Sequence, residues 1–303
     1  MIDQLVAGRG QPASAEVGPG DDAAVLRCAD GRTVVSTDML VQGRHFRLDW
    51  SSPEQIGRKA IAQNAADIEA MGARPMAFVV GFGAPADTAA SAVAELFDGM
   101  WTEARRVDAG IVGGDLVQAD GWVISVTVLG DLGGRRPVLR SAARPGASLA
   151  VAGDLGRSAA GYALWRSNIA DFPELRARHL VPQPPYGQGV VAADAGAQAM
   201  TDVSDGLIAD LGHIAAASGV TIELSTAALA KDRQALDDAA GRVGVDPWTW
   251  VLGGGEDHAL VAVFPDAVPA GWRVIGAVVD GPARVLVDGG QWHGAGGWQS
   301  FDG

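Results

Sequence analysis

The sequence predicts an α+β protein of two α/β-type domains, and three observations carry this prediction. The 303 residues, 31.0 kDa in mass, provide enough chain for one large domain or for two of about 150 residues each. Apolar residues make up 48% of the chain and charged residues 19%, which is typical of a globular protein with a full core. Strand-like and helix-like stretches are interleaved in both halves, so each half is expected to hold a sheet and its own helices.

In the N-terminal half the expected order of elements is β-α-β-α-β-β. The first strand ends at Asp38, and the first helix begins at Pro53 because proline suits the first helical position. Gly72 and Pro75 stop that helix. We therefore expect a split β-α-β unit with its helices on one face of a mixed sheet. The expected elements are strands over 33–37, 76–82 and 122–129, helices over 53–71 and 88–107, and residues 111–112 leading into Gly113-Gly114-Asp115.

The segment from Arg135 to Gly146 is rich in arginine and proline, and it marks the expected hinge between the halves. We place an N-terminal domain for ATP, metal and dimer contacts at 1–140 and a C-terminal α+β domain at 141–303. The second half shows no repeat of the first. Its expected strands are 148–152, 220–224, 258–264, 272–278 and 284–288, and its expected helices are 157–167, 188–199 and 207–217.

Charge and cysteine content exclude several classes of function. A net charge of −13 argues against nucleic acid or an anionic membrane as a partner, because both require a basic surface. The single cysteine, Cys28, rules out an intramolecular disulfide framework. The N-terminus shows no secretory pattern, and no uncharged apolar run approaches the roughly 20 residues of a membrane span. We expect a cytoplasmic protein.

The most informative stretch is Asp202-Val203-Ser204-Asp205, two carboxylates with a hydroxyl between them just before an apolar helical pattern. Taken alone, Ser204 or Asp205 would simply cap the helix that starts at Leu207. Similar acidic corners recur, however, and together they indicate a cage for hard cations such as Mg²⁺, which prefers oxygen ligands. The other corners are Gly20-Asp21-Asp22, Ser36-Thr37-Asp38, Asn64 with Asp67, and Gly113-Gly114-Asp115.

Each corner taken singly is more simply explained as a turn or cap, because Asp favours both. Asp67 is the exception, since it falls inside a helix and, with Asn64 one turn earlier, forms a polar spot that requires a partner. There is no Gly-Lys dipeptide, so the Walker-type phosphate loop is excluded. With only two lysines in the chain, metal ions would have to join the acids to a polyphosphate.

Three further residues fit ligand contact. Glu256 follows three glycines that permit close backbone approach, which suits a ligand better than a simple turn. His45 follows a Gly-Arg pair, and it is equally well explained as a surface histidine. Trp298 lies beside a glycine, where it could stack on a ligand or pack on its own domain.

The ordered set of motifs resembles the thiamine-monophosphate kinase family from Gly18 to Phe301. That resemblance implies a two-domain fold like that of aminoimidazole ribonucleotide synthetase, with first-domain sheets pairing in a homodimer. It implies direct transfer of the γ-phosphoryl group of ATP to thiamine monophosphate, with several Mg²⁺ ions and no covalent nucleophile. The matching motifs are GPGDDAAVL, STDMLVQGRHF, RKAIAQNAADIEAMGARP, GGD, VLRSAARPG, TDVSDGLIADLGHIAAASG and GGGEDHAL.

The resemblance also assigns roles to residues of this chain. Implied catalytic residues are Asp202, Asp205 and Arg140; nucleotide contacts are Gly114, Asp115, Arg140 and Ser204; substrate contacts are His45, Glu256 and Trp298. Implied metal ligands are Asp22, Ser36, Thr37, Asp38, Asp67, Asp115, Asp202 and Asp205. The chain departs from the family where Leu116 replaces the usual Thr after Gly-Gly-Asp and where His258-Ala259 replaces the usual Tyr-Glu.

Rival functions would use the same acids. Selenophosphate synthetase, another ATP-using member of the superfamily, would need a reactive cysteine in an N-terminal glycine-rich loop, and Cys28 is not so placed. A metal-dependent phosphohydrolase or a non-catalytic metal-binding module would also gather aspartates. Retention of Arg140, His45 and Glu256 beside the acids favours the kinase.

Overall fold

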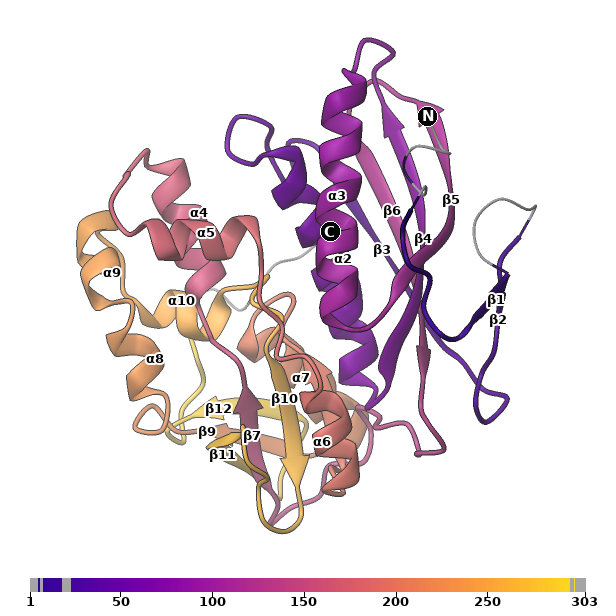
Figure 1. Ribbon diagram of the computed structural model, residues 1–303. Coiled ribbons are helices and arrows are strands. Elements are labelled where there is room, and N and C mark those ends of the chain that lie inside the picture. The colour runs from indigo at the N-terminus through magenta and orange to yellow at the C-terminus, as the bar shows by residue number, and fades with distance from the viewer. Residues whose placement is uncertain (1–4, 6–7, 18–22, 295–296, 298–303) are drawn as a thin grey trace. The chain divides into compact units, whose positions relative to one another are not determined.

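The structure is a computed structural model, and it describes residues 5, 8–17, 23–294 and 297 (Figure 1). The chain forms two compact units. The first unit comprises residues 1–68 and 73–135, and the second comprises 69–72 and 136–303. The expected domain boundaries, 1–140 and 141–303, and the ATP, metal and dimer contacts expected of the first domain stay predictions.

The first unit holds a four-stranded mixed sheet in the order β3-β6-β4-β5. Strands β3 and β4 both pair antiparallel with β6, and β4 pairs parallel with β5. The helices α2 and α3 lie along one face of this sheet (Figure 1), which confirms the expected split β-α-β arrangement. The bounds are β3 (Val34–Val41), α2 (Pro53–Ala70), β4 (Arg74–Ala84), α3 (Ala90–Arg106), β5 (Gly110–Gln118) and β6 (Val123–Asp131).

The two faces of this sheet differ in burial because successive side chains of a strand point to opposite faces. The face under the helices carries fully buried side chains, which include Leu40, Phe78 and Val126. The opposite face, which we call the open face, has no helix on it among the described residues of the first unit. Its exposed apolar side chains are 36% to 57% accessible, and they are Val35, Met39, Val79 and Val117.

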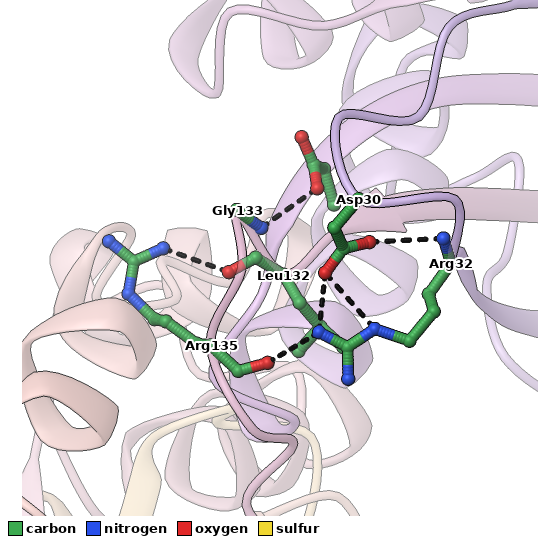
Figure 2. Close-up of polar contacts among 6 residues, drawn as sticks. Asp30, Arg32, Leu132, Gly133 and Arg135 are labelled. Atoms are coloured by element: carbon green, nitrogen blue, oxygen red, sulfur yellow. Dashed lines mark hydrogen bonds and ion pairs between the residues drawn. The ribbon is translucent and has the colours of Figure 1, made fainter.

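The chain leaves the first unit through a turn that is held by hydrogen bonds and an ion pair, shown in Figure 2. The Arg32 guanidinium donates to the Arg135 carbonyl at 2.9 Å and pairs with Asp30. Asp131 accepts the Gly133 N–H at 2.8 Å, and Arg135 also donates to the Leu132 carbonyl at 3.0 Å. The segment expected to act as a hinge therefore begins at a residue that is fixed to the first unit.

The second unit holds a six-stranded sheet in the order β12-β9-β11-β7-β10-β8. All pairs are antiparallel except β12 with β9. Its core joins apolar side chains of this sheet to those of helices α4, α7 and α10. The strand bounds are β7 (Ser148–Ala152), β8 (Ala199–Asp202), β9 (Thr221–Leu224), β10 (Leu260–Phe264), β11 (Arg273–Val279) and β12 (Arg284–Val287). The helix bounds are α4 (Arg157–Arg166), α5 (Pro173–Leu180), α6 (Gln188–Asp194), α7 (Leu207–Ser218), α8 (Ala230–Gln234), α9 (Asp237–Val243) and α10 (Trp248–Gly253).

The α+β class of two such units is confirmed, and the differences from expectation are local. The helix expected over 188–199 ends at Asp194, because Gly196 adopts a left-handed backbone with φ of 77°. Strand β8 then pairs with β10, so Met200 enters a sheet core rather than a helix. Four short helices, α5, α8, α9 and α10, were not predicted from the sequence, nor was the two-stranded ladder of β1 (Ala15–Val17) with β2 (Val25–Leu26). None of the helices in the described ranges has the length and apolar character needed to cross a membrane.

Candidate functional site

In the first unit, strand β3 and helix α2 bring together one group of predicted ligands. The Ser36 hydroxyl donates to the Asp67 carboxylate at 2.6 Å. The backbone N–H of Asp38 donates to the Asn64 side-chain oxygen at 3.1 Å, and Gln63 donates to the Asp38 carboxylate at 3.1 Å. The partner that the polar spot on α2 requires is therefore supplied by β3. We call Ser36, Asp38 and Asp67 the helix-side group.

The sheet places two other predicted ligands on its open face. The Thr37 hydroxyl donates to the Val126 carbonyl at 3.0 Å, pointing away from its neighbours Ser36 and Asp38. Asp115 pairs in register with Gly81, which shares its face with the exposed Val79. Thr37 and Asp115 thus form an open-face pair, which lies across the sheet from the helix-side group.

Two predicted contact residues of the first unit lie within a strand and just after one. Gly114 on β5 has no room for a side chain, because an added Cβ would lie 2.0 Å from the Val80 carbonyl oxygen. His45 lies in the turn after β3, where its Nδ1 accepts the Val41 N–H at 3.0 Å. This contact assigns the proton of the neutral ring to Nε2, so Nε2 is a donor. The His45 carbonyl also accepts a hydrogen bond from the buried Lys59 ammonium at 2.9 Å.

In the second unit, the turn 202–206 joins β8 to α7, and its two predicted ligands do not cap the helix. The N-cap is Gly206, with φ of 133° and no side-chain cap. The N–H groups of Asp205 and Gly206 instead donate to the buried Asp210 carboxylate, at 3.1 and 3.0 Å. The cap explanation of Ser204 or Asp205 is therefore wrong. Within the described part of the chain, the Asp205 carboxylate accepts no hydrogen bond.

Burial and like charge shape the electrostatics of this turn. Burial raises the pKa of Asp205 above its ordinary value; His213 opposes the shift and Asp202 adds to it. Burial likewise raises the pKa of Asp210 to about 7, with Asp202 adding to the effect. Carboxylates gathered in this way resist ionisation unless a cation neutralises them.

Asp202 itself is held by a residue outside the predicted set. Its carboxylate lies 3.0 Å from Nδ1 of His258, and both side chains are buried. His258 has a left-handed backbone, with φ of 52°. Such a conformation is uncommon for a side chain other than glycine, and it marks sites where the surroundings fix the residue.

The three glycines before Glu256 pack against protein rather than serving only a ligand. An added Cβ at Gly255 would lie 2.4 Å from the Ser204 carbonyl oxygen, and one at Gly206 would lie 2.7 Å from that of Gly253. This close approach lets the Glu256 N–H donate to the Ser204 carbonyl at 2.8 Å. Glu256 is thereby placed beside the turn 202–206, with its side chain partly exposed.

Arg140 is the cationic member of the second-unit group. Its carbonyl accepts the Ser218 hydroxyl at 2.9 Å, which fixes the backbone beside the C-terminal end of α7. Burial raises the pKa of Asp205, and the exposed Arg140 guanidinium is among the charges that oppose this rise, so the two charges lie within electrostatic reach of each other. An exposed guanidinium at this place suits a phosphate ligand.

The predicted ligands are thus divided among the helix-side group, the open-face pair and the turn 202–206. Among the described residues, no three His, Cys, Asp or Glu side chains lie close enough to share one metal ion. The donor set nevertheless fits Mg²⁺, because it consists of carboxylate and hydroxyl oxygens, and one or two carboxylates per ion suffice when water and phosphate complete the shell. Asp22 and Trp298 lie outside the described residues.

Three residues that contact this site or its surroundings were not predicted from the sequence. Asp210 replaces the expected cap, His258 holds Asp202, and the buried His179 of α5 lies 3.3 Å from Glu256. His258 carried a signal, since it departs from the usual residue of the family. His179 carried none, because nothing in its local sequence links it to residue 256.

Comparison with known proteins identifies relatives over almost the whole chain. Residues 20–132 match the AIR synthase related protein N-terminal domain, and residues 144–288 match the corresponding C-terminal domain. The chain is 70% identical to a thiamine-monophosphate kinase of Mycobacterium tuberculosis H37Rv, covering 99% of this chain and 90% of that protein. It is 49% identical to the one of Corynebacterium glutamicum, covering 86% and 80%.

Two solved structures share the fold. Thiamine-monophosphate kinase from Stenotrophomonas maltophilia superposes with a TM-score of 0.83 at 32% identity, covering 95% of each chain. AaThiL complexed with AMPPCP and TMP superposes with a TM-score of 0.82 at 31% identity, covering 93% of this chain and 91% of that one.

Proposed function

This chain belongs to the thiamine-monophosphate kinase family of AIR synthase related proteins, and from that membership we infer that it phosphorylates thiamine monophosphate with ATP to give thiamine diphosphate. The observation that carries this conclusion is the 70% identity to a thiamine-monophosphate kinase over 99% of the chain. A related structure holds the ATP analogue AMPPCP together with TMP, which supports the same two substrates.

We propose that catalysis rests on positioning and charge neutralisation. The phosphate of thiamine monophosphate attacks the γ-phosphorus of ATP, the bond from that phosphorus to the bridging oxygen breaks, and ADP leaves. Arg140 supports this role, because its guanidinium lies within electrostatic reach of Asp205. Gly114 and Ser204 would contact the nucleotide through groups that the backbone fixes.

We propose Mg²⁺ as the metal. Asp202 and Asp205 would hold ions in the second unit, while the helix-side group and Asp115 would do so in the first, with Asp22 and Thr37 as further ligands. When bound, the ions would neutralise phosphate charge at a site where the proposed ligands are carboxylates and Arg140 is the cationic member. The position of Asp115 and the helix-side group on opposite faces supports several ions rather than one.

We propose that His45, Glu256 and Trp298 bind the thiamine part. The Nε2–H of His45 and the partly exposed carboxylate of Glu256 have the polarity to orient a polar, cationic substrate. An indole face stabilises a cation by roughly 0.5–2 kcal/mol, which is the contribution expected of Trp298.

We propose further that the protein is a homodimer paired through the sheet of the first unit. The open face supports this, because it exposes Val35, Met39, Val79 and Val117 together. An exposed apolar sheet face with free strand edges is stabilised when a second copy covers it.

The activity is tested by incubating the protein with ATP, Mg²⁺ and thiamine monophosphate and following ADP and thiamine diphosphate by chromatography. We expect the two products in equal amounts. Release of inorganic phosphate without thiamine diphosphate would instead support the metal-dependent phosphohydrolase.

A further inference from the structure

In the second unit, a buried histidine contacts Glu256, the acidic residue that we propose binds the substrate. His179 of α5 places its Nδ1 3.3 Å from the Glu256 carboxylate and 3.3 Å from the Ser158 hydroxyl of α4. We propose that His179 is a positioning residue for substrate specificity, which holds the Glu256 carboxylate in the orientation that binds the thiamine part. This inference rests on the substrate role of Glu256 proposed above.

The chemistry of this 3.3 Å contact indicates which atom carries the proton. An ionised carboxylate can only accept, so Nδ1 carries the proton and donates it toward Glu256. Ser158, His179 and Glu256 do not form a nucleophilic triad. A triad requires the acid and the hydroxyl on opposite ring nitrogens, whereas here both lie at Nδ1, and the Ser158 side chain is buried.

The surroundings fix the imidazole ring. The Tyr162 ring lies against it, with centroids 5.2 Å apart and planes tilted by 54°. Helices α4 and α5 meet at Gly161, where an added Cβ would lie 2.2 Å from the Leu175 carbonyl oxygen and 3.0 Å from the His179 Cβ. The ring therefore has little freedom to follow a moving carboxylate.

The other end of the contact is fixed as well. Glu256 has a left-handed backbone, with φ of 63°, and its N–H is bonded to the Ser204 carbonyl at 2.8 Å. With the backbone and the carboxylate both held, the side chain does not need to be ordered when substrate binds. Loss of this preorganisation should raise the KM for thiamine monophosphate by about 3- to 10-fold.

The experiment compares His179→Phe and His179→Asn. Phenylalanine keeps a ring against Tyr162 but lacks a donor, whereas the asparagine amide nitrogen takes the place of Nδ1. We expect His179→Phe to raise the KM for thiamine monophosphate by about 3- to 10-fold with the KM for ATP unchanged, and His179→Asn to recover most of that loss. Arg178→Ala, which removes a neighbouring side chain of α5 that pairs with Asp154, is the control and should change neither KM.

A double-mutant cycle separates positioning from packing. If His179 acts through Glu256, adding His179→Phe to Glu256→Gln should raise the KM for thiamine monophosphate no further. An equal increase in both backgrounds, or a rise in both substrates' KM with a lowered Tm, would overturn the inference. Should His179→Phe fail to fold, His179→Gln, whose amide reaches the Nε2 position instead, replaces it.

Glu256→Gln alone tests the premise. If it leaves the KM for thiamine monophosphate unchanged, the substrate role of Glu256 is wrong and the inference falls with it. If it raises that KM while His179→Phe does not, the substrate role stands and only the positioning role is overturned.

Discussion

The imidazole Nδ1 of His258 lies 3.0 Å from the carboxylate of Asp202, and both side chains are almost fully buried. A proposed metal ligand is therefore oriented from behind by a residue of the loop that also carries Glu256. Partners of this kind affect metal affinity without touching the metal, because they fix the direction in which the ligand points.

From this contact we expect His258→Leu to raise the Mg²⁺ concentration for half-maximal activity by about 10- to 100-fold. The variant leaves a buried carboxylate without this donor, so its unfolding free energy should also fall, by about 1–3 kcal/mol. His258→Asn keeps a nitrogen donor near the Nδ1 position and should recover most of the Mg²⁺ dependence. Equal Mg²⁺ titrations for wild type and His258→Leu would contradict the prediction.

Asp202→Asn and Asp205→Asn should each lower kcat by orders of magnitude while the fold persists. The structure sharpens this expectation, because α7 has no side-chain cap, and Asp210 accepts the N–H groups of Asp205 and Gly206 just before the helix. A loss of activity would therefore not follow from a lost cap. Steady-state kinetics with circular dichroism gives the measurement, and Asp238→Asn, an exposed acid of α9, serves as the control.

Metal removal should abolish turnover. The residues proposed to surround the phosphates are mostly carboxylates, with Arg140 as their cationic member, so these side chains alone do not neutralise a triphosphate. EDTA should stop thiamine diphosphate formation and weaken ATP binding by calorimetry, and excess Mg²⁺ should restore both. Undiminished turnover in EDTA would rule out the metal-dependent mechanism.

Asp257 should give the protein a distinctive pH dependence. Burial raises its pKa from 3.8 to about 7, so the folded state keeps a proton that the unfolded state releases near pH 4. The unfolding free energy of the wild type should therefore fall relative to that of Asp257→Asn as the pH rises from about 4 to about 7. The expected fall is up to about 4 kcal/mol, and the difference should stay constant above pH 7. Urea unfolding at pH 5, 6, 7 and 8 checks this, and parallel curves for the two proteins would refute it.

The open face of the first-unit sheet should be covered in solution. We expect sedimentation to give twice the 31.0 kDa of the chain. Met39→Glu places a charge on that face and should shift the protein toward the monomer, whereas Glu95→Lys on the outer side of α3 should not. A 31 kDa wild-type species at micromolar concentration would contradict the dimer.

The sequence predicted most of the fold because hydrophobic periodicity is a local signal. Strand β7 and helix α2 agree with expectation within a residue or two, since glycine and proline mark their ends. Strand β8 was missed because four residues carry too little pattern to compete with a neighbouring helix.

The candidate site was predictable only as a set of residue types. Alternation along β3 already implies that Thr37 points away from Ser36 and Asp38, yet only the ladder shows that Asp115 shares the face of Thr37. The contacts of Glu256 with His179 and of Asp202 with His258 join residues 77 and 56 positions apart. No local pattern encodes such pairs.

The start of helix α4 has a consequence for synthesis of the chain. Its N-cap is Gly156, which has no side chain to cap with, and the N–H groups of Gly156 and Ser158 are accepted by Asp257, 101 and 99 residues later. At a ribosomal rate of roughly 5–20 residues per second, that carboxylate is translated about 5 to 20 s after the helix it completes. During this interval the N–H groups of Gly156 and Ser158 lack their partner in the protein. The start of α4 receives its native hydrogen bonds only after Asp257 has been synthesised.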